Sequence, residues 1–318
     1  MKAAVYTKYG PPDVVHITDI EKPVPKDNEV LLKIRASSVN PLDWHFMRGA
    51  PFVVRIGAGL RKPKVTRLGV DLAGSVEAVG RSVTQFKPGD PVFGCMRGAF
   101  AEYVCAAEDK LALKPANLSF EEAAAVPVAA ISALQSLRDK GHIQRGHKVA
   151  IDGASGGVGT FAVQIAKSFG AEVTAVCSAR NVDRARSLGA DHVIDYTQQD
   201  FTKTGQRYDL ILAANAYHSI FDYRRALNQR GICVVVGGGG VQILQALLVG
   251  SLLSLMGKKK MAFLMAKISQ KDLVCLKDLL EAGKIAPVID RRYPFTDVAE
   301  AIRYLEEGHA QGKVVITF

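Results

Sequence analysis

The middle of the chain repeats short apolar runs followed by segments with helical spacing of apolar residues. Runs suited to buried strands occur at 149–151, 172–177, 192–195, 208–214 and 231–236. Segments with an apolar helical face lie around 161–166, 182–188 and 217–227. This alternation predicts a parallel sheet with helices on both faces, in which ligands bind at the carboxyl ends of the strands.

The two ends of the chain follow a different pattern. Strand-like segments at 1–6, 29–36, 68–80, 91–94 and 100–105, separated by glycine and proline turns, predict a β-rich domain. Residues 39–49 predict a loop leading into a short helix that begins near Pro41. Toward the C-terminus we expect a strand at 263–267, an amphipathic helix at 270–282, a proline-containing join at 287–294, a helix at 298–306 and a strand at 313–318.

The most apolar stretch is Val241–Met256. It is shorter than the roughly 20 residues that a membrane-spanning helix needs. We therefore expect a helix that is buried or that forms a subunit interface. The lysine run at 258–260 leaves contact with a membrane surface as the alternative.

Four glycines crowd into residues 153–159, directly after an apolar run and before a helix. A helix N-terminus presents free N–H groups and partial positive charge, so a pyrophosphate can bind there if no side chain blocks it. This context favours a dinucleotide site over a merely tight turn. The residues expected to contact the cofactor here are Ala154, Ser155, Gly156, Gly157 and Val158.

The end of the next strand indicates which dinucleotide binds. An NAD site usually carries Asp or Glu about 20 residues after the glycines, but this chain has Ser178 there, followed by Arg180. A hydroxyl and a guanidinium suit a 2′-phosphate, so we expect NADPH rather than NADH. The alternative is that these arginines form a solvated helix face. Asp183 would support NAD, but its place inside the following helix argues against that role.

Further cofactor contacts are expected where the other strands end. Tyr196, Asn215 and the pair Gly237–Gly238 each follow a predicted strand. Because the carboxyl ends of parallel strands share one edge of the sheet, we expect these residues on the same rim as Ser178.

The composition excludes several other classes of protein. The chain is 48% hydrophobic and 23% charged, which is ordinary for a globular enzyme. Its net charge of +10 fits a phosphate-rich ligand and a basic surface, and no nucleic-acid-binding motif occurs. Five scattered cysteines argue against a disulfide framework or a zinc cluster. We expect reduced thiols in the cytoplasm and no signal peptide.

Several long segments resemble the medium-chain dehydrogenase/reductase superfamily, in particular its zinc-independent quinone oxidoreductase branch, which includes enoyl and alkenal reductases. The segments are V-N-P-L-D-W (39–44), G-V-D-L-A-G-S-V-E-A-V-G (69–80), F-K-P-G-D-P-V-F-G (86–94), G-A-S-G-G-V-G (153–159), S-L-G-A-D-H-V-I-D-Y (187–196) and G-K-V-V-I (312–316). The resemblance implies a GroES-like catalytic domain from residues 1–121 and 286–318 and a Rossmann domain from residues 122–285. It also implies a homodimer, and it adds Gln311 and Lys313 to the expected cofactor contacts.

The chain departs from the zinc alcohol dehydrogenases of this superfamily at their metal ligands. Pro41 stands where those enzymes resemble C-G-x-D-x-H with a cysteine, and Val70 stands where they have the histidine of G-H-E. Their four-cysteine structural zinc lobe is missing. Because a catalytic zinc needs three protein ligands, we expect no metal.

Without a Lewis acid, the resemblance implies hydride transfer from NADPH to quinones or α,β-unsaturated carbonyls. The charge that develops on the substrate oxygen then needs hydrogen-bond donors or water. By resemblance, Asn40 is the expected polar group near the nicotinamide, and a turn residue before Pro41 is the alternative. Asp43 is expected to orient its neighbours or to relay a proton. Trp44 and Phe93 are expected either to line an apolar pocket or to belong to the core.

Two other functions remain open at this point. One is an NADPH-binding interaction or redox-sensing protein with little turnover, which only an activity measurement distinguishes. The other is a zinc alcohol dehydrogenase with displaced ligands. The basic segment 52–67 is interpreted as a solvated loop, with a flap that admits an acidic or phosphate-bearing substrate as the alternative.

Overall fold

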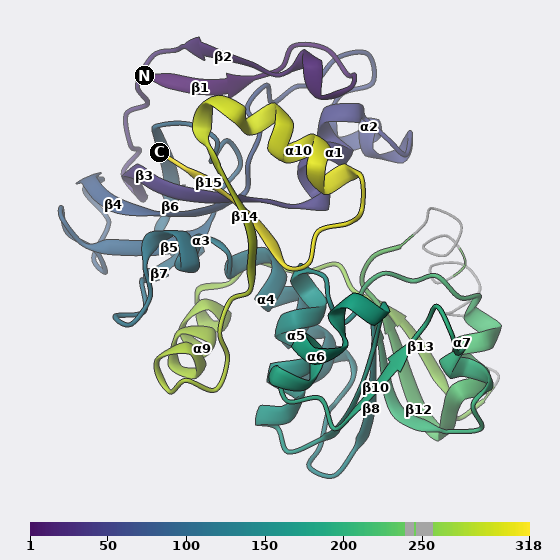
Figure 1. Cartoon of the computed structure of the whole chain (residues 1–318). Helices are drawn as coiled ribbons and strands as arrows, with labels where there is room; N and C mark the ends of the chain where they lie inside the picture. Colours follow the sequence, from purple (N-terminus) through teal and green to yellow (C-terminus); the bar gives the residue numbers. More distant parts are fainter. Residues whose placement is uncertain (239–244, 246–256) are drawn as a thin grey trace. The chain divides into compact units, whose positions relative to one another are not determined.

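The computed structural model describes residues 1–238, 245 and 257–318, which form two compact units (Figure 1). Unit 1 comprises Met1–Val128, Ile268–Glu281 and Pro287–Phe318, and unit 2 comprises Ala129–Lys267 and Ala282–Ala286. The domain boundaries 1–121 with 286–318 and 122–285 stay predictions. The expected interface helix at Val241–Met256 lies outside the described residues, apart from Gln245.

Unit 2 is built on a six-stranded parallel sheet in the order β10-β9-β8-β11-β12-β13. The strands are β8 (Lys148–Asp152), β9 (Glu172–Cys177), β10 (His192–Asp195), β11 (Tyr208–Ala213), β12 (Leu227–Val235) and β13 (Lys260–Phe263). The helices of this region are α4 (Pro127–Gln135), α5 (Gly157–Ser168), α6 (Val182–Ser187) and α7 (Ile220–Ala226). This strand order is that of a doubly wound sheet, which confirms the predicted Rossmann domain.

The apolar runs of unit 2 form its core. Val149, Ala150 and Ile151 in β8 are completely buried, as are the matching residues of β11. Strands buried on both faces need continuous apolar sequence, which explains why the runs lack alternation. β13 begins at Lys260, so the strand predicted at 263–267 was misplaced; a lysine at the strand's exposed start concealed it.

Unit 1 holds a seven-stranded sheet in the order β14-β15-β3-β4-β5-β7, with β6 also paired to β3. A separate two-stranded sheet pairs β1 (Lys2–Val5) with β2 (His16–Asp19). The larger sheet consists of β3 (Glu29–Val39), β4 (Asp71–Val79), β5 (Pro91–Cys95), β6 (Tyr103–Ala107), β7 (Leu111–Leu113), β14 (Ile289–Pro294) and β15 (Lys313–Thr317). Its pairings are antiparallel except β14 with β15, and it confirms the predicted β-rich, GroES-like domain.

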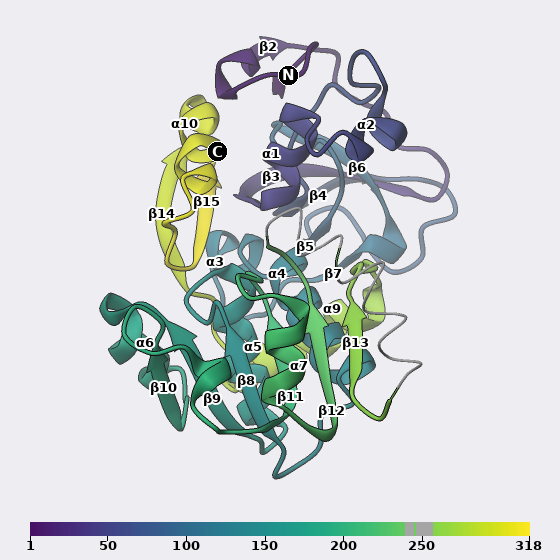
Figure 2. The ribbon, with the colours of Figure 1, turned by 90° about the vertical axis from the view of Figure 1, so that its right-hand side faces the viewer.

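Both chain ends contribute to unit 1. β15 pairs antiparallel with β3, so a strand from the C-terminal end of the chain, yellow in Figure 2, shares a sheet with one from the N-terminal part. The helices are α1 (Pro41–Arg48), α2 (Val53–Ala58), α3 (Phe120–Ala124), α9 (Gln270–Glu281) and α10 (Val298–Glu306). The join predicted at 287–294 contains β14, a strand at the sheet edge whose two central arginines are exposed, so no apolar alternation indicated it.

The helix predicted to begin at Pro41 does so. Pro41 occupies the first turn of α1, where its missing N–H costs nothing. Asp43 accepts the backbone N–H of Asn40 at 2.8 Å, and Gly49 ends the helix with a φ of +60°, a conformation that favours glycine. Among the described residues, no helix is long and apolar enough to span a membrane.

Candidate functional site

The glycine turn of unit 2 joins the end of β8 to the start of α5. Gly153 has a φ of +83°, and a Cβ on Gly159 would lie 2.1 Å from the Gly153 carbonyl oxygen, so the helix packs directly on the turn. A Cβ on Gly156 would meet only that oxygen, at 3.7 Å. No side chain in the described part of the chain caps α5. The N–H groups of its first turn therefore lack a side-chain acceptor, as an anion site requires.

The other predicted cofactor residues of unit 2 lie along the same edge of the sheet. Ser178 directly follows β9 and Tyr196 directly follows β10, whereas Asn215 and the Gly237–Gly238 pair come two residues after β11 and β12. The Ala216 N–H donates to the Gly237 carbonyl at 2.9 Å, which joins the last two loops. Parallel strands thus bring together residues that are far apart in sequence. Their contact with a cofactor stays a prediction.

The end of β9 carries no carboxylate. Ser178 Oγ accepts a hydrogen bond from Asn181 at 3.1 Å, and Arg180 is exposed beside it. Asp183 lies in the first turn of α6 and pairs with Arg186 at 3.4 Å. The sequence argument placed Asp183 inside this helix, and the structure agrees. These residues fit a 2′-phosphate because a hydroxyl and a guanidinium can both donate to it.

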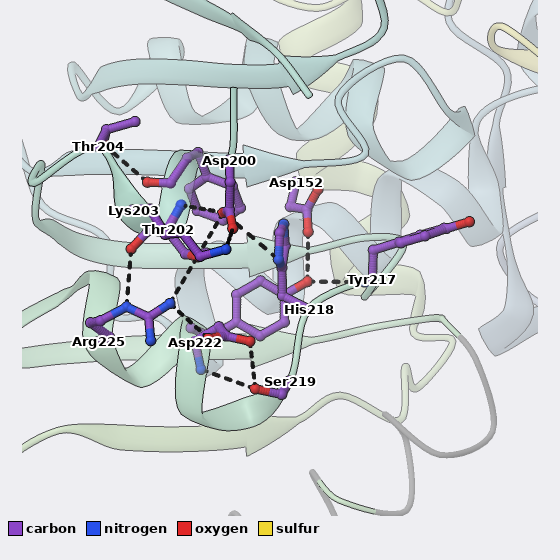
Figure 3. Close-up of polar contacts among 12 residues, drawn as sticks. Asp152, Asp200, Thr202, Lys203, Thr204, Tyr217, His218, Ser219, Asp222 and Arg225 are labelled. Carbon is purple, nitrogen blue, oxygen red and sulfur yellow. Dashed lines mark hydrogen bonds and ion pairs between the residues drawn. The ribbon is translucent and has the colours of Figure 1, made fainter. Parts of the chain in front are cut away.

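Figure 3 shows a polar network that includes Asp152, the residue before the glycine turn, and that sequence reasoning missed. Asp152, the last residue of β8, accepts the Tyr223 hydroxyl at 2.5 Å. The Tyr223 oxygen in turn accepts the backbone N–H of Tyr217 at 3.2 Å. The His218 ring lies 3.8 Å from Asp200 and packs edge-on against the Tyr223 ring. The network thereby fixes the loop after β11 to the strand that precedes the glycine turn.

Burial dominates the ionisation of this network. Loss of solvent raises the pKa of Asp152 to about 6, although the Tyr223 hydrogen bond and nearby His218 oppose the rise. Desolvation, together with the Asp152 charge, also raises the pKa of Tyr223. The sequence signal for this network is Asp152, an acid at the end of an apolar run. A buried acid needs hydrogen-bonding partners, so its position predicts a polar network nearby.

In unit 1, Asn40 lies in a buried position with its amide fully engaged. Its Nδ2 donates to Asp71 at 2.8 Å and to the Ser38 carbonyl at 3.3 Å, and its Oδ1 accepts from Lys313 at 2.6 Å. An amide has two N–H donors, so both are used within the protein. This geometry favours a positioning role for Asn40 over direct donation to a substrate.

Asp71 is the centre of this cluster, and sequence reasoning did not single it out. Its carboxylate accepts from Ser38 Oγ at 2.8 Å, from Lys313 Nζ at 3.2 Å and from the Val128 N–H at 2.8 Å, in addition to Asn40. The Cys95 thiol lies 3.6 Å away, and burial beside this carboxylate raises its pKa well above the usual value. An acid inside the apolar segment L-G-V-D-L-A-G was the signal for such a cluster.

Lys313 is also buried, with 3% of its surface exposed. Its ammonium donates to the Val39 carbonyl at 3.3 Å as well as to Asn40 and Asp71. An ammonium has three donors, so contact with a cofactor would require one of these bonds to break. Gln311 is half-buried, and its backbone N–H donates to Asp290 at 3.1 Å.

Asp43 is buried and accepts two backbone N–H groups, from Asn40 at 2.8 Å and from Gly69 at 3.1 Å. Desolvation raises its pKa to about 7, while these bonds and Lys313 oppose the rise and the Asp71 charge adds to it. The carboxylate thus joins α1 to the turn before β4. This geometry corresponds to the orienting role among the two roles predicted.

The predicted pocket residues differ in exposure. Phe93 in β5 is completely buried, which places it in the core rather than on a pocket wall, because a ligand needs accessible surface. Trp44 is half-buried on α1 and packs against the apolar core that contains Met47 and Ile316.

The side chains of the structure offer no set of donors that suits a metal ion in its described part. In residues 1–238, 245 and 257–318, no group of three or more His, Cys, Asp or Glu side chains is arranged to hold an ion. At the cluster in unit 1, Asp71 faces a lysine ammonium and amide and hydroxyl donors. Such donors repel or compete with a cation, so this set does not fit zinc.

The chain matches two family models. Residues 26–116 match the alcohol dehydrogenase GroES-like domain, and residues 188–316 match the zinc-binding dehydrogenase model. The first match lies within unit 1.

Curated relatives align over nearly the whole chain. The chloroplast envelope quinone oxidoreductase homolog of Arabidopsis thaliana is 33% identical, with 99% of this chain and 98% of that protein covered. The NADPH-dependent alkenal/one oxidoreductase of the same plant is 32% identical over 99% of this chain and 79% of its own length. The quinone oxidoreductase structure from Coxiella burnetii has a TM-score of 0.88 at 29% identity, covering 100% of this chain and 99% of that chain. Because these similarities extend over both units, the chain belongs to the medium-chain dehydrogenase/reductase superfamily, in its quinone oxidoreductase branch.

Proposed function

We propose that this protein is an NADPH-dependent reductase that transfers hydride to quinones or α,β-unsaturated carbonyls without zinc. The observation that carries the proposal is the uncapped N-terminus of α5 on a glycine turn beside the central strand of the parallel sheet. The kinship with a quinone oxidoreductase homolog and an alkenal/one oxidoreductase supports this substrate class.

The cofactor would be held at the carboxyl edge of the sheet in unit 2. The N–H groups at Gly157 and Val158 would bind the pyrophosphate, and Ser178 with Arg180 would bind the 2′-phosphate. When bound, NADPH supplies the hydride. The chain's own part is to bind and orient, and the glycines keep side chains out of the phosphate path.

The polar cluster around Asp71 in unit 1 would contribute by holding its own side chains in fixed positions, not by donating to the substrate. Lys313 and Asp71 fix the Asn40 amide, and Asp43 fixes the start of α1. Because the Asn40 donors are used internally, we propose that a water molecule rather than this amide delivers the proton to the substrate. The donors around Asp71 support a reaction that needs no zinc, despite the family model's description.

NADPH oxidation tests the proposal when a quinone, an enone and a simple aldehyde are compared with chelator present, and NADH serves as the control. We expect turnover of the quinone or enone with NADPH, unchanged by the chelator. Loss of turnover on chelation would point to a zinc enzyme. Tight NADPH binding with no acceptor reduced would instead indicate an interaction or redox-sensing protein.

The phosphate contact has a separate test. Arg180→Gln should raise the NADPH dissociation constant by about tenfold or more, since hydrogen bonds to charged groups contribute about 1.5–3 kcal/mol. The matched change Arg186→Gln removes an exposed arginine that pairs with Asp183 and should have little effect. Equal effects of the two substitutions would assign the contribution of Arg180 to general surface charge.

We further propose that the protein is a cytoplasmic homodimer. All five cysteines are free, which suits a reducing compartment. The dimer rests on the family resemblance. Light scattering of the purified protein and fractionation of cells check the two statements. A monomer, or recovery in an organelle such as those named for chloroplast relatives, would contradict them.

A further inference from the structure

The short helix α2 directs its one charged side chain, Arg55, toward the protein and exposes apolar side chains to solvent. Arg55 points inward, where its Nε donates to the Gly49 carbonyl at 2.9 Å and its guanidinium lies 4.6 Å from the centre of the Tyr9 ring. Ala58 is also buried, at 5% exposure. An ordinary surface helix has the reverse arrangement, with apolar residues inward and charges in water.

The outer side of this segment is apolar. Phe52, Val53, Ile56 and Leu60 are exposed at 65, 64, 67 and 61% of their surface. Scattered exposed apolar residues need no explanation, but four within nine consecutive residues concentrate apolar surface in one segment. α2 itself lies next to α1 at the edge of unit 1 (Figures 1 and 2).

Positive charge borders these apolar residues. Arg61, Lys62 and Lys64 follow directly and are exposed. The sequence contains no Asp or Glu from Trp44 to Val70. Two other cations of this stretch have partners inside unit 1, since Arg48 pairs with Glu306 and Arg55 lies on Tyr9. The α2 surface, defined as Phe52, Val53, Ile56, Leu60, Arg61, Lys62 and Lys64, is therefore apolar in the middle and basic at one end.

We propose that the α2 surface docks the protein on an anionic lipid bilayer. The apolar side chains enter the boundary between headgroups and acyl chains, and the three cations lie at the lipid phosphates, as in interfacial helices. A second copy of the chain fits less well, because a symmetric contact would bring the same cations together.

Sedimentation with vesicles tests the proposal on the full-length protein. Vesicles of phosphatidylcholine alone are compared with vesicles that also contain phosphatidylglycerol, at low and high salt. We expect binding to the anionic vesicles that weakens as salt screens the charges. Equal binding to both compositions, or no binding to either, would overturn the proposal.

Two variants separate the contribution of the basic residues to vesicle binding from that of the apolar residues. Arg61→Gln/Lys62→Gln/Lys64→Gln should weaken binding to anionic vesicles by roughly a hundredfold, because each cation near the surface contributes about fivefold. Phe52→Ser/Ile56→Ser should weaken it by at least about tenfold, through loss of buried apolar area. Turnover of a water-soluble acceptor should stay unchanged in both variants.

Lys140→Gln/Lys148→Gln/Lys284→Gln is the matched control, since it removes three exposed lysines of unit 2 and lowers the net charge equally. It should retain binding to the anionic vesicles. Equal losses in the two triple variants would overturn the assignment to α2 and indicate general attraction by net charge. A raised substrate KM without vesicle binding would identify a substrate flap, and a changed oligomeric state would identify a subunit interface. Both results contradict docking on lipid.

Discussion

Two buried carboxylates, Asp71 and Asp152, are compensated in different ways. Asp71 accepts an ammonium, an amide, a hydroxyl and a backbone N–H, whereas Asp152 is bound chiefly by the Tyr223 hydroxyl. A buried carboxylate loses its free energy of hydration, and its hydrogen-bonding and charged partners determine how much of that free energy is offset. For Asp152 the partners offset only part of the lost hydration free energy, so burial raises its pKa to about 6.

Replacing Lys313 by Met should destabilise unit 1 by about 3–5 kcal/mol, because it leaves the Asp71 charge buried without its cation. The fluorescence of Trp44, the single tryptophan of the chain, reports urea unfolding of this unit. The double change Asp71→Asn/Lys313→Met removes both charges and should recover part of the loss. A double variant no more stable than Lys313→Met would mean that packing, rather than charge, accounts for the effect.

The pH dependence of stability should reveal Asp152. Its folded pKa lies above the usual 3.8, so the native state binds the proton more tightly than the unfolded chain. The stabilising contribution is complete below pH 3.8 and is lost as the pH rises through about 6. Asp152→Asn is neutral throughout, so its stability relative to the native protein should increase from pH 4 to pH 7, by on the order of 2 kcal/mol.

Urea unfolding followed by circular dichroism at several pH values measures this difference. Tyr223→Phe provides the comparison, because the lost hydrogen bond should raise the pKa of Asp152 further and move the window to higher pH. A difference between native protein and Asp152→Asn that is constant with pH would show that Asp152 does not titrate in this range.

At the scale of elements, the turn between β8 and α5 combines two separate requirements for glycine. Gly159 must lack a side chain because the helix packs on the Gly153 carbonyl, whereas the space at Gly156 is open within the protein. The first requirement concerns folding and the second concerns the ligand, so substitutions at the two positions should behave differently.

Gly159→Ala should lower both stability and NADPH affinity, since its Cβ would lie 2.1 Å from a backbone oxygen. Gly156→Ala should leave the thermal midpoint nearly unchanged but weaken NADPH binding by about tenfold or more, because a methyl group would enter the pyrophosphate path. Calorimetric titration and thermal unfolding measure the two effects. Unaltered NADPH affinity in Gly156→Ala would show that the phosphate lies elsewhere.

At the scale of the whole molecule, unit 1 depends on pairing between the chain ends. Ile316 in β15 and Trp44 in α1 belong to one apolar core although they lie far apart in sequence. Ile316→Ala should therefore lower the stability reported by Trp44 by about 2–5 kcal/mol. Ile211→Ala in unit 2 is the control and should affect the Trp44 signal less. Equal shifts would indicate that the two units unfold together.

The sequence alone determined the elements whose pattern is local. Continuous apolar runs identified five of the six strands of unit 2, all except β13. The glycine spacing identified the turn before α5, and Pro41 identified the start of α1. The alternation of strands and helices predicted a parallel sheet, which was enough to place Ser178, Tyr196 and Asn215 on one edge of it.

Only the tertiary structure decided which polar groups meet. Asp71 and Lys313 are 242 residues apart, and Asp152 and Tyr223 are 71 residues apart, so no local periodicity relates them. The exposure of the apolar side chains of α2 could not be predicted from the sequence either, because the inward position of Arg55 depends on Tyr9 from another part of the chain. Periodicity encodes neighbours within a few residues, whereas buried charge pairs and exposed apolar surfaces depend on how distant strands are ordered in the sheets.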